Sequence, residues 1–278
     1  MKNKTWFVTG ASKGLGLSLV KRLLANGYSV AGTSRNIDEL KKSVGEHTNF
    51  LPVAVTLTDE SNVSQAIEST IKRFGIIDVV VNNAGFGLTG SLEELSDREA
   101  RDNFDVNVFG SLNVIRQVMP HFRKQQSGHI FNIASIGGFT GAFPGFGIYC
   151  ATKFAVHGFS ESLAEEVKPF GIKVTIVSPG YFRTNFLATS LQTPKNEILE
   201  YKTVRESQSV HQNQYNGNQP GDPDKASDVM IQVAESKDHL LHLFLGKDSY
   251  SLAEEKMRLV KIDLDAIRAL ATATDFNS

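Results

Sequence analysis

The stretch Thr9-Gly10-Ala11-Ser12-Lys13-Gly14-Leu15-Gly16 decides the fold. A short apolar strand, Trp6–Thr9, is expected just before it, and a helical pattern, Leu15–Asn26, begins within it. Glycines allow the backbone to turn tightly and to approach a pyrophosphate, and the free N–H groups at the start of the helix stabilise the phosphate charge. A glycine-rich turn without a ligand is the alternative, but the order strand, loop, helix favours a dinucleotide-binding loop.

Apolar strands and longer helical patterns alternate along the rest of the chain. The expected strands are Trp6–Thr9, Tyr28–Thr33, Phe50–Val55, Asp78–Asn82, His129–Ala134, Lys173–Val177 and His242–Leu245. The expected helices are Leu15–Asn26, Ile37–Val44, Ser61–Phe74, a long helix after a capping box of Ser96 and Glu99, Tyr149–Val167 and Leu252–Ala269. This alternation predicts an α/β fold, a doubly wound parallel sheet of about seven strands in a Rossmann-like three-layer sandwich.

The whole chain, residues 1–278, is expected to form a single domain, because its length suits one α/β core. Residues 184–223 interrupt the alternation with a polar, turn-rich stretch. Connections of this length are typically lids or mobile loops, so a lid over the site is predicted here. Residues 250–278 are expected to form a C-terminal helical extension, whose role the sequence leaves open.

Composition excludes several classes of protein. The formal net charge is −1, with Lys and Arg scattered among acidic residues, so no nucleic-acid partner is expected. No apolar run is long enough to span a bilayer and no secretory stretch begins the sequence, so no membrane partner is expected. Cys150 is the only cysteine, which excludes an intramolecular disulfide. We therefore expect a cytoplasmic protein without a bound metal.

A second motif, Tyr149-Cys150-Ala151-Thr152-Lys153, carries chemistry of another kind. A spacing of four on a helix places Tyr149 and Lys153 on one face. An ammonium near a phenol favours the ionised phenol, which would make Tyr149 an acid or base near neutral pH. Taken alone, the pair is also typical of an ordinary amphipathic helix.

Taken together, the motifs resemble those of the short-chain dehydrogenase/reductase family over nearly the whole chain. The spacing of Gly10, Gly14 and Gly16 matches that family's cofactor loop. The other matching motifs follow in order: Asn82-Asn83-Ala84-Gly85 after the fourth strand, Asn107 on the long helix, Ser135 at the end of the fifth strand, Tyr149 with Lys153, and Pro179-Gly180 followed by Thr184.

This resemblance implies a role for each matching residue. Tyr149 would be the general acid/base, and Ser135 would hold the substrate oxygen. Lys153 would bind the nicotinamide ribose and lower the pKa of Tyr149, and Asn107 would hold a water that completes a proton relay. Thr184 would contact the cofactor carboxamide. Without the other motifs, Ser135 would be read as a strand-end hydroxyl and Thr184 as a helix cap.

The cofactor is expected to be NADP(H) rather than NAD(H). Enzymes that prefer NAD usually carry an acid at the end of the second strand, where this chain has Ser34 followed by Arg35. Arg35 can pair with a 2′-phosphate, and Lys13 adds a second positive charge; as an alternative, both are ordinary surface cations. Thr56 stands where many relatives have an acid near adenine. The expected cofactor-binding residues are Gly10, Ser12, Lys13, Gly14, Leu15, Gly16, Ser34, Arg35, Asn83, Ala84, Gly85, Tyr149, Lys153, Pro179, Gly180 and Thr184.

The loops expected around the nicotinamide are rich in aromatic residues, which suits an apolar or ring-containing substrate. The candidate substrate residues are Phe86, Phe143, Phe146, Tyr181 and Phe186, with Phe139 and Phe182 in the same loops. Core packing is the competing explanation for each of them. The expected partner is a small carbonyl or alcohol compound, and the resemblance implies a homodimer or homotetramer formed through the helices around Phe104–Phe122 and Tyr149–Val167.

Two other functions remain open beside an NADP(H)-dependent oxidoreductase. The first is an epimerase or dehydratase of the extended relatives, which share a tyrosine–lysine pair but usually differ in glycine spacing. The second is a non-catalytic regulatory protein that senses NADP(H) on the same fold. The presence of Asn107, Ser135, Tyr149 and Lys153 together argues against a non-catalytic protein.

Overall fold

A seven-stranded parallel sheet forms the centre of the molecule in the computed structural model, which describes residues 4–238 and 240–276. The strand order is β3-β2-β1-β4-β6-β7-β9, and every neighbouring pair is parallel. The strands are β1 Thr5–Val8, β2 Ser29–Ser34, β3 Phe50–Ala54, β4 Val79–Asn82, β6 Gly128–Ile133, β7 Ile172–Pro179 and β9 His242–Leu245. The predicted doubly wound α/β fold is thus confirmed.

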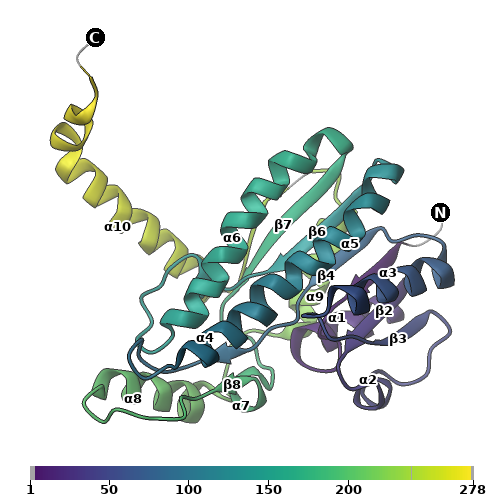
Figure 1. Ribbon diagram of the computed structural model, residues 1–278, viewed down its shortest axis with the longest axis horizontal. Coiled ribbons are helices and arrows are strands. Elements are labelled where there is room, and N and C mark those ends of the chain that lie inside the picture. The colour runs from purple at the N-terminus through teal and green to yellow at the C-terminus, as the bar shows by residue number, and fades with distance from the viewer. Residues whose placement is uncertain (1–3, 239, 277–278) are drawn as a thin grey trace.

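Helices cover both faces of the sheet (Figure 1). They are α1 Gly14–Ala25, α2 Ile37–Val44, α3 Glu60–Phe74, α4 Asp97–Phe104, α5 Gly110–Gln125, α6 Gly147–Val167, α7 Phe186–Thr189, α8 Lys202–Ser209, α9 Pro223–Glu235 and α10 Lys247–Ala271. One apolar core joins the sheet to α1, α2 and α9, and a second joins it to α3, α5 and α6. Adjacent residues of β1 divide between them, with Trp6 in the first core and Phe7 in the second.

The order in which successive strands are added to the sheet changes direction between the neighbouring strands β1 and β4. From β1 the chain adds β2 and β3 on one side, and from β4 it adds β6, β7 and β9 on the other. Helices on opposite faces diverge at such a point, which leaves a crevice beyond the carboxyl ends of the strands where ligands bind. The glycine loop after β1 and the Asn83 loop after β4 both lie at this crevice.

The long helix predicted after Ser96 is present but not continuous. Its capping box is formed, because Ser96 accepts from the Glu99 N–H and the Glu99 carboxylate accepts from the Ser96 N–H. Between α4 and α5, however, Asp105–Phe109 form a π-helical turn. A π turn widens the helix locally and occurs frequently at functional sites.

Three segments differ from their expected form. Helix α9 was not predicted, although Asp222 caps it and Pro223 occupies its first turn, which is a typical helix start. The predicted lid, 184–223, contains α7, α8, a π turn at Val210–Tyr215 and a two-residue strand β8, Leu191–Gln192, paired in parallel with β5, Gly87–Leu88. The C-terminal helix α10 starts five residues before the expected start at Leu252, at Lys247. No helix within the described residues has the length and apolarity needed to cross a membrane.

Candidate active site

The glycine loop packs so closely on its neighbours that side chains are excluded at two positions. Gly10 has φ +66°, and a Cβ built on it would lie 2.9 Å from Cα of Ala84. A Cβ on Gly16 would overlap the Asn83 amide and the Gly10 carbonyl. This leaves the first turn of α1 open to a ligand at its N-terminus, as the pyrophosphate of a dinucleotide requires.

Asn83 and Thr9 lock the loop after β4 onto the glycine loop. The Asn83 Nδ2 donates to the carbonyls of Thr9 at 2.9 Å and Gly10 at 3.0 Å. In return, Thr9 Oγ1 accepts from the backbone N–H groups of Asn83 and Ala84, both at 3.0 Å. The two loops therefore form one rigid floor at the switch point of the sheet.

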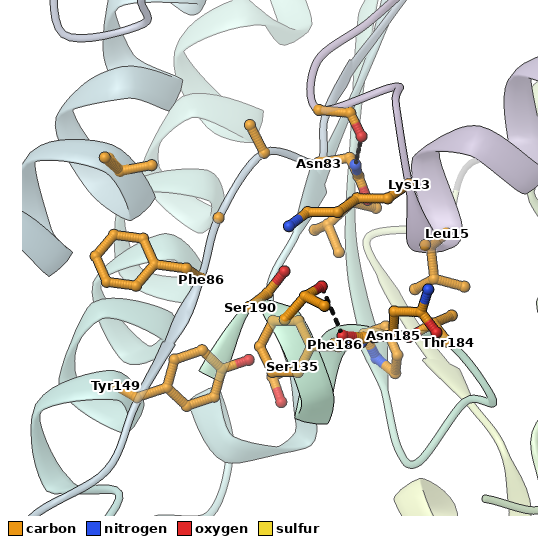
Figure 2. Close-up of a pocket in the computed structure, with 18 of the residues that line it drawn as sticks. Lys13, Leu15, Asn83, Phe86, Ser135, Tyr149, Thr184, Asn185, Phe186 and Ser190 are labelled. Carbon is orange, nitrogen blue, oxygen red and sulfur yellow. Dashed lines mark hydrogen bonds between the residues drawn. The ribbon is translucent and has the colours of Figure 1, made fainter. Parts of the chain in front are cut away.

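A cavity of about 540 Å³ lies on this floor, at the carboxyl ends of the strands (Figure 2). Nearly all of the predicted site residues line it: Gly10, Ser12, Lys13, Gly14, Leu15, Ser34, Arg35, Asn83, Ala84, Gly85, Phe86, Ser135, Phe143, Phe146, Tyr149, Lys153, Pro179, Gly180, Tyr181, Thr184 and Phe186. The two predicted residues outside this lining are Gly16 and Asn107. Gly16 packs beneath the loop, and Asn107 lies behind Phe86.

Tyr149 and Lys153 lie one turn apart on α6, with Ser135 beside the tyrosine. Burial raises the pKa of Tyr149 despite an opposing hydrogen bond from Ser135. Burial also lowers the pKa of Lys153 to about 8, and its Nζ donates to the Ile133 carbonyl at 2.9 Å. The resemblance implied that Lys153 lowers the pKa of Tyr149, whereas in this structure burial is the largest influence on that pKa and raises it, and the opposing influence is the Ser135 hydrogen bond.

The Asn107 side chain is fully engaged with the protein. Its Oδ1 accepts from the Phe86 N–H at 3.0 Å, and its Nδ2 donates to the Phe86 carbonyl at 3.0 Å and to Thr152 Oγ1 at 3.1 Å. Because Thr152 is next to Lys153, this amide ties the π turn to the face of α6 that carries Tyr149 and Lys153, and to the loop after β4. A Cβ on Gly85 would come 2.9 Å from Asn107 Oδ1, so only glycine fits between them.

Two exposed cations lie at the far end of the cavity, beyond the glycine loop. Ser34 Oγ donates to Ser12 Oγ at 3.3 Å, which joins the end of β2 to the loop. Arg35 and Lys13 follow these serines, are exposed and line the cavity. Glu39 of α2 lines the same end, so the local charge is one unit positive rather than two. Asp59, three residues after Thr56, is the N-cap of α3, where its side chain accepts from the Asn62 N–H.

Thr184 faces the glycine loop from the other side of the cavity. Its Cβ lies 3.8 Å from the position that a Cβ on Gly14 would occupy. The Thr184 hydroxyl accepts from the Phe186 N–H at 3.3 Å, close to the start of α7. Thr184 therefore acts as a local cap and also lines the space expected to hold the cofactor.

Aromatic rings enclose the part of the cavity next to Tyr149. The Tyr149 ring lies 6.0 Å from that of Phe186 and 6.4 Å from that of Phe146, centroid to centroid. Phe182 also lines the cavity. Phe139, from the same group of loops, instead packs edge-on against Phe244 at 5.2 Å and is not part of the lining.

Sequence reasoning missed two polar residues of the lid that line the cavity. His211 Nε2 is 2.9 Å from the Tyr181 hydroxyl. Gln219 is 2% exposed, and among the described residues neither polar atom of its side chain has a hydrogen-bond partner. Such a buried, unpaired amide is costly in the absence of a ligand. The preceding turn-rich sequence marks a loop but gives no sign of which residue points inward.

The segment 184–223 is held in place by a buried carboxylate, that of Glu94. Glu94 accepts from the backbone N–H groups of Ser91 at 2.6 Å and Ile198 at 2.8 Å, and it pairs with Arg205 of α8. Burial alone would raise the pKa of Glu94, but these N–H groups and the Arg205 charge lower it overall. The carboxylate therefore stays ionised. It holds the backbone at Ile198 and the side chain of Arg205, both of which precede the π turn at Val210–Tyr215.

Three potential metal ligands lie outside this cavity, further along α6. Single ligand atoms of His157, Glu161 and His242 fall within 4.8 Å of one another. His157 is held by Ser178 at 3.0 Å, and the other two form a contact of 4.0 Å at the protein surface. A histidine–glutamate pair at the sheet edge accounts for this arrangement without an ion.

Comparisons with known proteins agree with this geometry. The sequence profile described as short chain dehydrogenase matches residues 4–195. The chain is 35% identical over 274 residues to "Oxidoreductase BOA17" of Botryotinia fuckeliana, covering 98% of this chain and 99% of that protein. A short-chain dehydrogenase from Streptomyces avermitilis has a similar structure, with a TM-score of 0.91, 34% identity and coverage of 99% and 100%. The 3-ketoacyl-(acyl-carrier-protein) reductase of Brucella melitensis, solved with NADH, gives a TM-score of 0.73 at 26% identity, covering 87% and 96%.

Proposed function

This chain belongs to the short-chain dehydrogenase/reductase family of oxidoreductases, and we propose that it is an NADP(H)-dependent enzyme acting on a carbonyl/alcohol pair. The single observation that carries this proposal is the position of Tyr149, Ser135 and Lys153 around one end of a cavity whose other end is a glycine loop. In this proposal Tyr149 is the proton donor, and the cavity of about 540 Å³ holds the dinucleotide and a small substrate.

The proton chemistry follows from the surroundings of Tyr149. Because burial raises its pKa, the phenol keeps its proton at neutral pH and can donate it to a carbonyl oxygen. Ser135 hydrogen-bonds the same oxygen and fixes its distance from the phenol. When bound, the reduced nicotinamide supplies a hydride to the carbonyl carbon, so that one hydride and one proton convert the carbonyl into an alcohol.

Lys153 and Asn107 support this transfer. With a pKa of about 8, Lys153 is mostly protonated at neutral pH and can return a proton to the Tyr149 phenolate. Its Nζ faces the Ile133 carbonyl at the end of β6, where the ribose of a nicotinamide nucleotide would lie. Asn107 fixes the backbone of Phe86 and thereby the wall against which the nucleotide packs.

The preference for NADP(H) rests on charge. Arg35 and Lys13 are exposed cations at the adenosine end, and neither forms an ion pair within the described part of the chain. The 2′-phosphate of NADP(H) would form ion pairs with both side chains, whereas the uncharged ribose diol of NAD(H) would form none. Glu39 opposes this preference in part, and a relative was solved with NADH, so the ratio of the two affinities is the quantity to measure.

The proposed substrate is an apolar or ring-containing carbonyl or alcohol compound. Five aromatic residues line the cavity: Phe86, Phe143, Phe146, Tyr181 and Phe186. The rings of Phe146 and Phe186 lie next to that of Tyr149. His211 and Gln219 add polar groups from the segment 184–223, which would close over the substrate as a lid. A substrate with an apolar body and one additional polar group matches this lining.

Titration of the purified protein with NADPH and NADH, followed by a screen of ketones, aldehydes and alcohols at 340 nm, tests the proposal. We expect tighter binding of NADPH and turnover of at least one aromatic or alicyclic carbonyl compound. Tight binding without turnover of any compound would instead favour a regulatory protein that senses NADP(H). A lack of binding by either nucleotide would overturn the cofactor assignment.

A further inference from the structure

Helix α10, Lys247–Ala271, leaves the body of the protein after its first turns (Figure 1). Ser249 and Ala253 are buried, but from Met257 onward every described residue is exposed. The exposed part of the helix, Met257–Ala271, is about 22 Å long at 1.5 Å per residue. Isolated helices of this length are marginally stable in water, so a partner is needed to hold it.

The exposed part carries an apolar row with coiled-coil spacing. Met257, Val260, Leu264 and Ile267 are 53%, 41%, 57% and 53% exposed, respectively. They follow one another at intervals of three, four and three residues, and Ala253 and Ala271 extend the row by four residues on each side. This is the a/d pattern of helices that pack against another helix, and so many large apolar side chains seldom stay in water.

The charges of the same segment indicate what kind of partner fits. Residues 254–271 hold four acidic and four basic side chains: Glu254, Glu255, Asp263, Asp265, Lys256, Arg258, Lys261 and Arg268. The segment is therefore neutral, whereas helices that bind anionic membranes or nucleic acids are strongly basic. A partner helix with an equal mixture of charges and its own apolar row satisfies these requirements, and a second copy of α10 is such a helix.

We propose that α10 pairs with α10 of a second copy of this chain in an antiparallel arrangement. Aligned on the apolar row, Val260 packs against the partner's Leu264, and Met257 packs against the partner's Ile267. The same register sets Glu254 beside the partner's Arg268, an ion pair that occurs twice by symmetry. It also covers Tyr250, which is 56% exposed at the base of the helix, with the end of the partner's α10.

The position of the protein bodies favours the antiparallel arrangement. In a parallel pair, the two protein bodies would crowd together at the same end. In the antiparallel pair the bodies lie at opposite ends of the two helices. Near the symmetry axis, Lys261 is already neutralised by Asp265 of its own helix.

Disulfide trapping tests the register directly. Cys150, the only native cysteine, is buried, so engineered thiols on α10 would dominate the oxidation. The double variant Val260→Cys with Leu264→Cys should form a covalent dimer on a non-reducing gel, while each single variant stays monomeric. Cross-linking of both single variants would show a parallel pair and overturn the arrangement. A double variant that gives no dimer would overturn the pairing itself.

Light scattering tests the contribution of the apolar row to assembly. The double variant Val260→Glu with Leu264→Glu should have half the molar mass of the unaltered protein, with NADPH binding unchanged as evidence of folding. The matched control is Ile262→Glu, the same kind of change on the opposite side of α10, which should keep the full mass. Equal masses for all three proteins would overturn the proposal. So would an unaltered protein that is monomeric and sediments with phosphatidylcholine vesicles, since a lipid surface would then be the partner.

Discussion

Nη2 of Arg205 donates to both carboxylate oxygens of Glu94, each at 2.8 Å, and the Glu94 side chain has no exposed area. This contact joins α8, in the segment 184–223, to the loop that follows β5. The segment reaches the cavity through His211 and Gln219, so whatever holds α8 in place also shapes the region proposed for the substrate.

Replacing Glu94 with Gln should loosen the lid. Hydrogen bonds to charged groups contribute about 1.5–3 kcal/mol each, so losing the charge should raise KM for the carbonyl substrate by about tenfold or more. The matched control is Glu93→Gln, which removes the charge at an exposed contact with Tyr201 and should change KM little. Steady-state kinetics on both variants make the comparison. Equal KM values for the two variants would show that the contact between Glu94 and Arg205 does not influence substrate binding.

Replacing Tyr149 with Phe should abolish proton transfer. We expect kcat to fall by about 10²–10⁴-fold, which is the usual contribution of a positioned acid or base. NADPH affinity should change by less than about threefold by the same reasoning, because the phenyl ring keeps its place beside Phe186. Tyr201→Phe, on the exposed side of the lid, serves as the control for a lost hydroxyl. A Tyr149→Phe variant that retains more than half of the activity would rule out this residue as the acid.

The rate of carbonyl reduction should depend on the ionisation of Lys153. Its pKa in the free protein is lowered to about 8 by burial, so the ammonium is lost as pH rises through that value. We expect kcat/KM for reduction to decline above pH about 8. Lys153→Arg, which stays charged, should not show this decline, although its maximum rate should be lower.

The same shift has the opposite effect on stability. The unfolded chain, in which the lysine has its ordinary pKa, binds more protons than the folded protein between pH about 8 and about 10.4. The contribution of Lys153 to folding should therefore become more favourable across this range. The test is to measure Tm of the unaltered protein and of Lys153→Met over this pH range. The Tm of the unaltered protein should rise relative to that of the variant as pH increases. A difference in Tm that does not change with pH would contradict the lowered pKa.

Replacing Arg35 with Asp should shift cofactor preference toward NAD(H). The new carboxylate would repel a 2′-phosphate and accept hydrogen bonds from a ribose diol. We expect the ratio of kcat/KM for NADPH to that for NADH to fall by about 100-fold, from two changes of roughly 1.4 kcal/mol each. Lys41→Asp, on the exposed face of α2 and outside the cavity lining, should leave the ratio unchanged.

Replacing Gln219 with Leu should stabilise the empty protein and weaken ligand binding. Its buried amide has no partner within the described residues, and an unpaired buried polar group costs about 1–3 kcal/mol. A higher Tm without ligand, together with a higher KM, would indicate that this amide is kept for substrate or cofactor. The control, Gln214→Leu, alters an exposed position of the same segment. A lower Tm for Gln219→Leu would mean that the amide supports the fold instead.

The parts of the molecule that could be predicted from sequence are those specified by local patterns. The final strand, His242–Leu245, has the predicted bounds, and the capping box at Ser96 starts α4 as predicted. The π turn around Asn107 was not predictable, because it forms where the Asn107 amide meets the Phe86 backbone, 21 residues away in the sequence. Local periodicity does not contain such a contact.

The candidate site likewise contains residues that local motifs predict and residues that only the tertiary fold brings to the cavity. Gly10, Tyr149 and Lys153 belong to short motifs with fixed spacing, and the sequence therefore indicated them. Gln219 and His211 line the cavity only because α8 and the following turns fold back over it, and nothing in their polar neighbourhood marks them. Phe139 shows the converse: it lies in an aromatic loop, yet it packs against Phe244 rather than in the cavity.

The two-residue ladder between β5 and β8 joins the segment 184–223 to the loop after β4 mainly through main-chain groups. The Gly87 N–H donates to the Ser190 carbonyl at 2.7 Å, and the Thr89 N–H donates to that of Gln192 at 2.8 Å. Every residue type carries a carbonyl, so substitutions at Ser190 and Gln192 keep these two hydrogen bonds. A Cβ on Gly87 would lie 2.7 Å from Leu191 Cδ1, so a larger residue there requires the Leu191 side chain to move. Single substitutions at Ser190 and Gln192, which line the cavity, would therefore change its lining while the backbone that holds this segment stays in place.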